Sequence, residues 1–182
     1  GTLGGANSTG HGVNSLGQVV GQSNNAEGAF RGFLYSGGTM TDLGTLGGDF
    51  SFAGGINTRG QVVGESSLSF DPIADVHAFV YEGGTMRDLG TLGGRISSAT
   101  AINDLGLIAG YSYTVGSVEH AFLYIDGMMI DLGTLGGGRS FGYAINGLGQ
   151  VVGSSSMADE LDMHAFIYSG GAMTDLNSLI DP

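Results

Sequence analysis

Four basic side chains each precede an aspartate by eleven residues, and this spacing is the first sign of chemistry in the chain. An imidazole or guanidinium beside a carboxylate can form a charge-assisted hydrogen bond, and such a histidine can also serve a catalytic or metal site. Because arginine replaces histidine in one pair, we interpret all four as structural donor–acceptor pairs. The pairs are Arg31 and Asp42, His77 and Asp88, His120 and Asp131, and His164 and Asp175.

Acidic side chains gather in four segments of variable length, and they form a second set of candidates. The segments span residues 22–31, 65–76, 111–119 and 154–163. Carboxylate oxygens suit Ca²⁺, although no segment matches a calcium-loop pattern, and the alternative is a solvated acidic rim. We expect no other cofactor. The candidate ligand or metal residues are Asp71, Asp75, Glu119, Asp159, Glu160 and Asp162.

The chain lacks the short motifs of common enzyme classes. It has no Gly-x-Ser-x-Gly elbow, no His-Glu-x-x-His and no Gly-x-x-x-x-Gly-Lys loop. Two catalytic alternatives remain open, namely a nucleophilic serine with a repeat histidine and a pair of facing carboxylates for glycoside hydrolysis. The pattern favours a protein that is not an enzyme.

A fixed repeat must position all these groups. Gly-Thr-Leu-Gly-Gly occurs at residues 1–5, 44–48, 90–94 and 133–137. Each copy continues with short segments rich in Val, Ile, Phe and Tyr, bounded by Gly, Asn or Asp, which is typical of β-strands. The sequence therefore predicts one all-β repeat domain over residues 1–182. Its four units span about residues 1–43, 44–89, 90–132 and 133–182.

Four antiparallel strands per unit is the spacing of a β-propeller blade. Small residues recur at every second position of the first strand, where blades crowd around the axis: Ser8, Ser51, Ser97 and Ser140, followed by Gly10, Ala53, Ala99 and Gly142. We therefore predict a β-propeller of four four-stranded blades, closed as a single-chain ring. The alternatives are half of a larger propeller completed by a second chain, and a β-solenoid.

The repeated triplet His-Ala-Phe at 77–79, 120–122 and 164–166 occurs with Asp-Leu-Gly-Thr-Leu-Gly-Gly at 42–48, 88–94 and 131–137. This combination resembles the HAF-repeat family of bacterial secreted proteins along the whole chain. The first copy departs from it, with Arg31-Gly32-Phe33 in place of the triplet. The resemblance implies an extracellular protein that resembles a propeller, with a signal peptide that is not in this chain.

Charge narrows the set of partners. Seventeen acidic residues outnumber five basic ones, giving a formal net charge of −12. This charge disfavours nucleic acid, and the absence of a long apolar run disfavours membrane insertion. The partners that remain compatible with this charge are an extracellular polymer, a cation and a second copy of the chain. We predict a secreted, non-catalytic binding or structural module with ligand contacts on the acidic loop face. The alternatives are a hydrolase of an extracellular polymer at that face and a self-assembling extracellular fibre protein.

Overall fold

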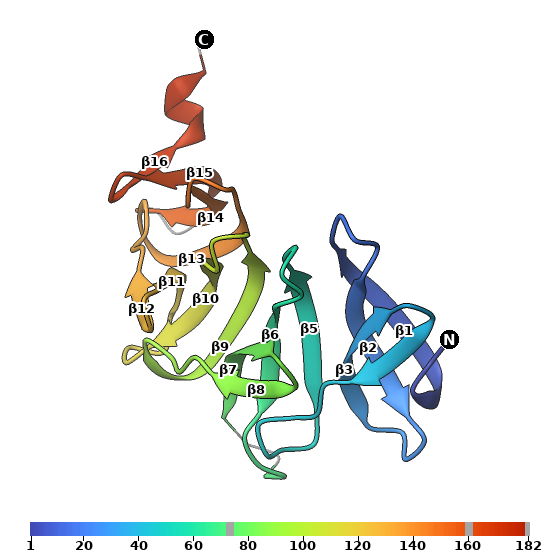
Figure 1. Ribbon diagram of the computed structural model, residues 1–182. Helices are drawn as coiled ribbons and strands as arrows, with labels where there is room; N and C mark the ends of the chain where they lie inside the picture. Colours follow the sequence, from blue (N-terminus) through green and yellow to red (C-terminus); the bar gives the residue numbers. More distant parts are fainter. Residues whose placement is uncertain (72–74, 159–161, 181–182) are drawn as a thin grey trace.

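The computed structural model describes residues 1–71, 75–158 and 162–180. Its described residues form strands connected by turns, with a single short 3-10 helix (Figure 1). The all-β prediction is confirmed. Among these residues no helix has the length and apolar character that spanning a membrane requires.

Each sequence unit folds as four consecutive antiparallel strands. Unit 1 contains β1 (Gly4–Val13), β2 (Val19–Asn25), β3 (Phe30–Ser36) and β4 (Thr39–Asp42). Unit 2 contains β5 (Ser51–Ile56), β6 (Val62–Ser67), β7 (Val76–Glu82) and β8 (Thr85–Asp88). Unit 3 contains β9 (Gly93–Ile102), β10 (Ile108–Thr114), β11 (Glu119–Ile125) and β12 (Met128–Asp131). Unit 4 contains β13 (Gly136–Ile145), β14 (Val151–Met157), β15 (Met163–Ser169) and β16 (Ala172–Asp175), followed by the 3-10 helix η1 (Leu176–Leu179).

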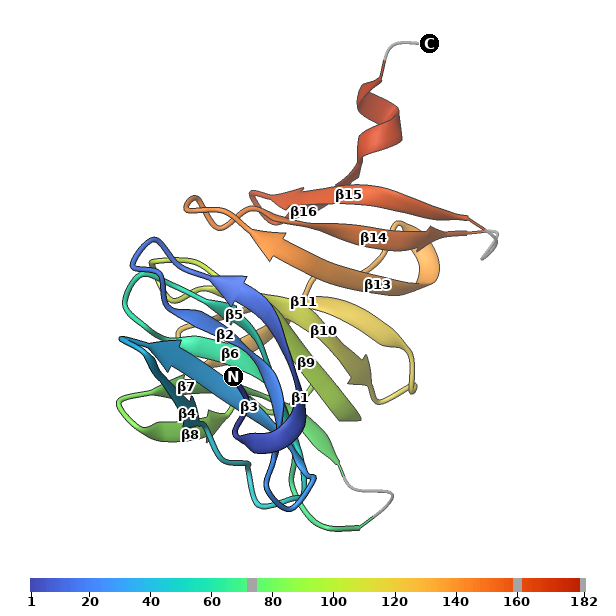
Figure 2. The same cartoon turned by 90° about the vertical axis from the view of Figure 1, so that its right-hand side faces the viewer.

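The prediction of a closed ring of four separate sheets is wrong. The strands form sheets of four, eight and four, because Val76 at the start of β7 pairs in parallel with Ile96 of the long strand β9. The sheets do not close. Units 1 and 4 lie at opposite ends of an open arc, as Figures 1 and 2 show. Each unit contacts its neighbours in sequence, so closure would need an interface between units 1 and 4.

The core is built between units rather than inside one sheet. Phe79 of unit 2 packs with Val20 and Leu43 of unit 1, and Phe166 of unit 4 packs with Ala109 and Leu132 of unit 3. These phenylalanines are fully buried. The repeated aromatic residue of the third strand is therefore a core residue, and the units stabilise one another by burying apolar surface at their interfaces.

The small face of the first strand lets neighbouring units approach closely. Ser51, Ser97 and Ala53 are completely buried against the preceding unit. A Cβ atom added at Gly54 would lie 3.1 Å from the carbonyl oxygen of Ala99 in the next unit. This is tighter than ordinary van der Waals contact, so the backbones of β5 and β9 leave no room for a side chain between them.

Candidate functional site

In each of units 2, 3 and 4, the hairpin of the third and fourth strands brings one histidine and one aspartate into contact. His77 Nδ1 lies 2.8 Å from Asp88 Oδ2, although Asp88 pairs across the hairpin with Phe79. Because diagonal neighbours in a sheet remain within reach of long side chains, the histidine still contacts the carboxylate. Nδ1 lies 2.9 Å from Oδ2 in His120–Asp131 and 2.8 Å from it in His164–Asp175.

Each of these aspartates also holds the turn that follows it. The amide of Gly90 donates to Asp88 Oδ1 at 2.7 Å, and the amide of Gly133 donates to Asp131 Oδ1 at the same distance. In unit 4, Asp175 accepts from the amide of Asn177 and caps η1. The hydrogen bond from His164 and the Asn177 amide lower the pKa of Asp175. The pairs thus link the third strand to the connection between units.

The expected Arg31–Asp42 pair is not formed. The Arg31 guanidinium donates instead to the carbonyl oxygens of Phe30 and Asp49, and Asp42 accepts from the amide of Gly44 at 2.8 Å. The longer arginine reaches past its own hairpin to the backbone of unit 2, which an imidazole at this position would not do. The aspartate keeps its role in the turn.

The acidic candidates that the structure describes do not form a metal-ligating group. Asp75 lies 2.5 Å from Arg95 Nε, and Glu119 lies 3.4 Å from Arg139 Nε. Asp71 is exposed, and the carbonyl oxygen of Asp162 accepts from the amide of Met157. Asp159 and Glu160 lie outside the described residues. No group of three or more metal-ligating side chains occurs in the described ranges.

The expected loops are shorter than the sequence suggested. The variable segments begin inside the second strand and end inside the third, so Glu65 belongs to β6 and Glu119 to β11. Alternation along β6 turns Glu65 towards unit 3, whereas the sequence interpretation placed it on a solvated rim.

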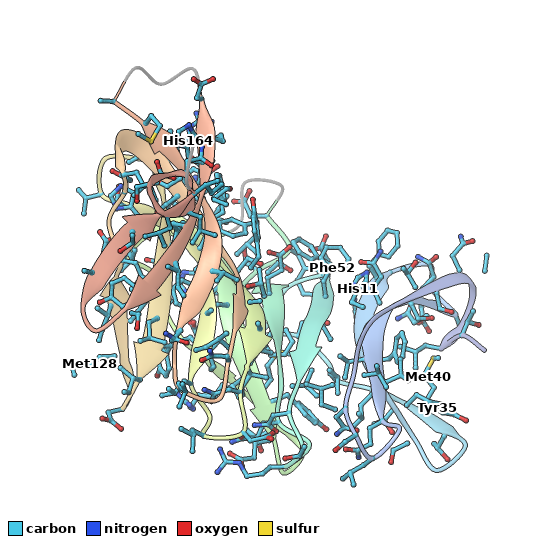
Figure 3. All side chains as sticks on the ribbon, turned by 90° about the horizontal axis from the view of Figure 1, so that it is seen from above. His11, Tyr35, Met40, Phe52, Met128 and His164 are labelled. Atoms are coloured by element: carbon cyan, nitrogen blue, oxygen red, sulfur yellow. The ribbon has the colours of Figure 1, made fainter. Side chains whose placement is uncertain are left out.

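A cavity of about 320 Å³ lies between units 1, 2 and 3. It brings together side chains that differ from one repeat to the next. Figure 3 labels His11 and Phe52, which lie near each other in that view and both line this cavity. The lining residues are His11, Gln22, Phe52, Ala53, Gly54, Gly64, Glu65, Ser98, Ala99 and Thr100. We call this cavity the inner cleft.

Glu65 is the acidic group of the inner cleft. Burial raises the pKa of its carboxyl, and the hydrogen bond from the Ser98 hydroxyl partly opposes this effect. Ser98 also shares a hydrogen bond with the Tyr111 phenol, whose pKa is raised by burial and by the nearby Glu65. With its pKa raised by burial, the Glu65 carboxyl keeps its proton to a higher pH than an exposed glutamate does.

His11 of unit 1 supplies an acceptor to the inner cleft. Its Nδ1 lies 3.0 Å from the carbonyl oxygen of Ala53. A carbonyl oxygen only accepts, so Nδ1 carries the proton and Nε2 of the neutral ring is an acceptor. Thr100 donates to the carbonyl oxygens of Ala109 and Gly142, which fixes its hydroxyl.

Sequence reasoning overlooked the inner cleft because it looked for what the repeats share. The sequence signal for this cleft was instead a difference between the repeats at two equivalent positions. The position of His11 holds Gly54, Thr100 and Tyr143 in the other units, and the position of Glu65 holds Gln22, Tyr111 and Ser154. The strands repeat in all four units, but the residue types at these two positions differ. The fold therefore does not require a particular side chain there, and these positions are free to serve binding.

The chain is similar in structure to three larger solved proteins. A chain described as TolB from Agrobacterium tumefaciens aligns with a TM-score of 0.67 and 18% identity over 93% of this chain and 65% of its own length. TolB from Acinetobacter baumannii aligns with a TM-score of 0.65 and 13% identity over 93% of this chain and 43% of its own length. The acylaminoacyl peptidase of Pyrococcus horikoshii aligns with a TM-score of 0.57 and 14% identity over 94% of this chain and 28% of its own length.

These likenesses establish a β-propeller-like fold and nothing of function. The chain spans less than two thirds of the length of each of these structures. No protein-family model matches it. No curated protein matches it in sequence.

Proposed function

We propose that the chain is a non-catalytic binding module made of four consecutive four-stranded units with a β-propeller-like fold, and that its ligand occupies the inner cleft. The observation that carries the proposal is the convergence of Glu65, His11 and Ser98, from three different units, on one cavity. A concave site with a few convergent polar groups and a perturbed carboxyl is the usual form of a small-ligand site.

The lining favours a neutral ligand rich in hydroxyl groups. Glu65, Gln22 and His11 together offer donors and acceptors, while Phe52 offers an apolar face. A phosphate or other anion would meet the carboxyl without a cation beside it among the residues that line the inner cleft. One sugar residue of an extracellular polysaccharide has the required combination of hydroxyl edges and apolar C–H face.

The acidic loop face is less suited to hold the ligand than we first expected. Asp75 and Glu119 each contact an arginine of the next unit. We assign these pairs, and the His–Asp pairs, to the support of loops and turns. Ca²⁺ binding at Asp71, Asp159, Glu160 and Asp162 stays a prediction.

Binding is preferred over hydrolysis at the same cleft. A carboxyl with a raised pKa suits a general acid, but glycoside hydrolysis needs a second carboxyl. Glu65 is the single acidic residue among those lining the inner cleft. Ser98 hydrogen-bonds Glu65 and Tyr111, and no described hydrogen bond connects it to a histidine that would activate it.

The HAF-repeat resemblance supports placing the module outside the cell, and its net charge of −12 supports a partner that is neither nucleic acid nor an anionic membrane.

A titration followed by NMR tests the proposal. Short neutral oligosaccharides are added to the labelled chain, and we expect shifts at the amides of His11, Glu65 and Ser98. His11→Ala should weaken binding about tenfold, as expected for the loss of one hydrogen bond. Tyr143→Ala is the matched control, because Tyr143 occupies the same repeat position in unit 4, outside the inner cleft.

Three results would overturn the proposal. One is the absence of shifts at the inner cleft with every sugar tested. Another is cleavage of the sugar during the titration, which would make the chain a hydrolase. The third is an equal loss of affinity in His11→Ala and Tyr143→Ala, which would show that binding occurs elsewhere.

A further inference from the structure

The three interfaces inside the chain repeat one hydrogen-bond pattern. A serine of the first strand accepts from a backbone amide of the preceding unit's third strand. The amide of Gly32 donates to Ser51 Oγ at 2.9 Å, and the amides of Ala78 and Ala121 donate to Ser97 Oγ and Ser140 Oγ at 2.8 Å. Each of these serines is completely buried.

A ladder of asparagines crosses the same interfaces at the other end of the strands. Asn14 Nδ2 donates to the carbonyl oxygen of Asn57 at 2.9 Å, Asn57 Nδ2 to that of Asn103 at 3.0 Å, and Asn103 Nδ2 to that of Asn146 at 2.8 Å. Every internal interface therefore uses one serine and one asparagine in fixed positions.

The outer face of unit 4 carries the two hydrogen-bond donors of this pattern, a third-strand amide and an asparagine Nδ2, but no described unit follows to supply the serine and carbonyl acceptors. Asn146 Nδ2 donates within its own turn, to Gln150, and Ala165 is exposed where Ala78 and Ala121 are fully buried. Val152 is 40% exposed, whereas its equivalents Val20, Val63 and Ala109 are fully buried. We call this surface the tail face.

The outer face of unit 1 presents the acceptor half. Ser8 is exposed and donates to the carbonyl oxygen of Gly1 at 2.8 Å, as Ser51 donates to that of Gly44. Its equivalents Ser51, Ser97 and Ser140 accept an amide in addition. Gly10 is exposed where Ala53 and Ala99 are buried. We call this surface the head face.

We infer that the tail face of one copy of the chain seats on the head face of a second copy. The amide of Ala165 donates to Ser8 Oγ of the second copy, and Asn146 donates to the carbonyl oxygen of its Asn14. The contact is heterologous, because different faces meet, so it closes a ring of copies or builds a filament. The named hydrogen-bonding groups are uncharged, and physiological salt screens the repulsion between the net negative charges of the two copies.

Sedimentation velocity of the chain over a wide concentration range, at roughly physiological salt, tests the inference. We expect mass-action self-association. Gly10→Arg should weaken it at least tenfold, because the side chain would occupy the space that Ala53 and Ala99 fill at internal interfaces. Within the unit, a Cβ at Gly10 meets only Val19 Cγ1, at 3.4 Å, so the variant should fold.

Gly116→Arg is the matched control, since Gly116 is exposed in the turn before β11 and a Cβ there meets only the Thr114 side chain. It should associate like the unmodified chain. A monomer at every concentration would overturn the inference, and so would association that survives Gly10→Arg unchanged.

A cross-link that does not depend on affinity provides a second test. The chain has no cysteine, so Ser8→Cys combined with Ala165→Cys introduces the only two thiols. Oxidation should give disulfide-bonded multimers. Ser8→Cys combined with Gly116→Cys should give far fewer, and equal yields from the two variants would contradict head-to-tail seating.

Discussion

At the scale of single residues, the largely buried carboxyl of Glu65 between units is the feature that the repeat does not explain. Glu65 stands on β6 opposite Phe52 and faces unit 3, with the Ser98 hydroxyl as its hydrogen-bond partner. A glutamine or a serine at this position, as in units 1 and 4, would avoid the desolvation of a charge. The presence of a carboxyl at this position in unit 2 supports the proposal that Glu65 contacts a ligand.

Glu65 makes stability depend on pH. Its folded-state pKa is raised above 4.5, so the folded chain binds more protons than the unfolded chain above that pH. The contribution of Glu65 to stability therefore falls as pH rises from about 4 towards neutral, and it levels off above the folded pKa. We predict that Glu65→Gln unfolds at a higher temperature than the unmodified chain at pH 7, and that the difference shrinks at pH 4.

Thermal unfolding at both pH values measures this effect. Glu27→Gln is the control, because Glu27 is exposed in the turn between β2 and β3. A difference for Glu65→Gln that is the same at both pH values would show that its carboxyl is not desolvated.

The buried serines carry a second prediction at this scale. Ser97 accepts from Ala78 and donates to the carbonyl oxygen of Gly90 at 2.6 Å, and it is fully buried. Ser97→Ala leaves both backbone groups without a partner and should cost about 2–3 kcal/mol of unfolding free energy. Ser8→Ala, at the exposed equivalent position, should cost much less. Urea denaturation of the two variants gives the comparison, and similar losses would contradict the role of serine as an inter-unit bridge.

At the scale of elements, the turn between the first and second strands joins neighbouring units. Asn57 Oδ1 accepts the amides of Arg59 and Gln61, which closes its own turn. Its Nδ2 then donates to the carbonyl oxygen of Asn103 in the next unit. One side chain therefore shapes a turn and fixes the distance between two sheets.

Removing that side chain separates the two roles. Asn57→Ala loses the turn and the inter-unit bond, whereas Asn146→Ala loses only the turn, because no described unit follows it. We predict that Asn57→Ala destabilises the chain by about 1–2 kcal/mol more than Asn146→Ala. Chemical denaturation of both variants measures the difference, and equal losses would show that the ladder contributes no stability.

Much of this element structure could be predicted from the sequence. The repeat indicated the strand order, and the small residues Ser51 and Ala53, two positions apart, identified the crowded first strand. The asparagines at the end of each first strand form turns, as this residue type commonly does at strand boundaries. Their bond to the next unit was missed, because a turn signal is local and says nothing of what the carboxamide nitrogen reaches.

The inner cleft could not be predicted in the same way. His11 stands outside the His-Ala-Phe triplets, and Glu65 was grouped with loop acids because the variable segment was read as beginning at residue 65. Strand pairing between Phe52 and Glu65 extends β6 past that point. The error in the strand boundary placed the carboxyl on the solvent side.

At the scale of the whole molecule, the four units form an arc rather than a ring. Stability in such an array comes from nearest-neighbour interfaces, so the two outer faces are the least supported parts. The exposed Val152 and Ser8 mark those faces. A ring of four blades would have buried both residues.

Amide hydrogen exchange of the chain at a concentration where it is monomeric tests this account most directly. Equivalent amides at Gly32, Ala78 and Ala121 donate to serines of a following unit, and Ala165 has no such unit in the described chain. We predict slow exchange at the first three amides and fast exchange at Ala165. Equally slow exchange at all four would contradict the open arc, and fast exchange at all four would contradict the packing of successive units through their serines.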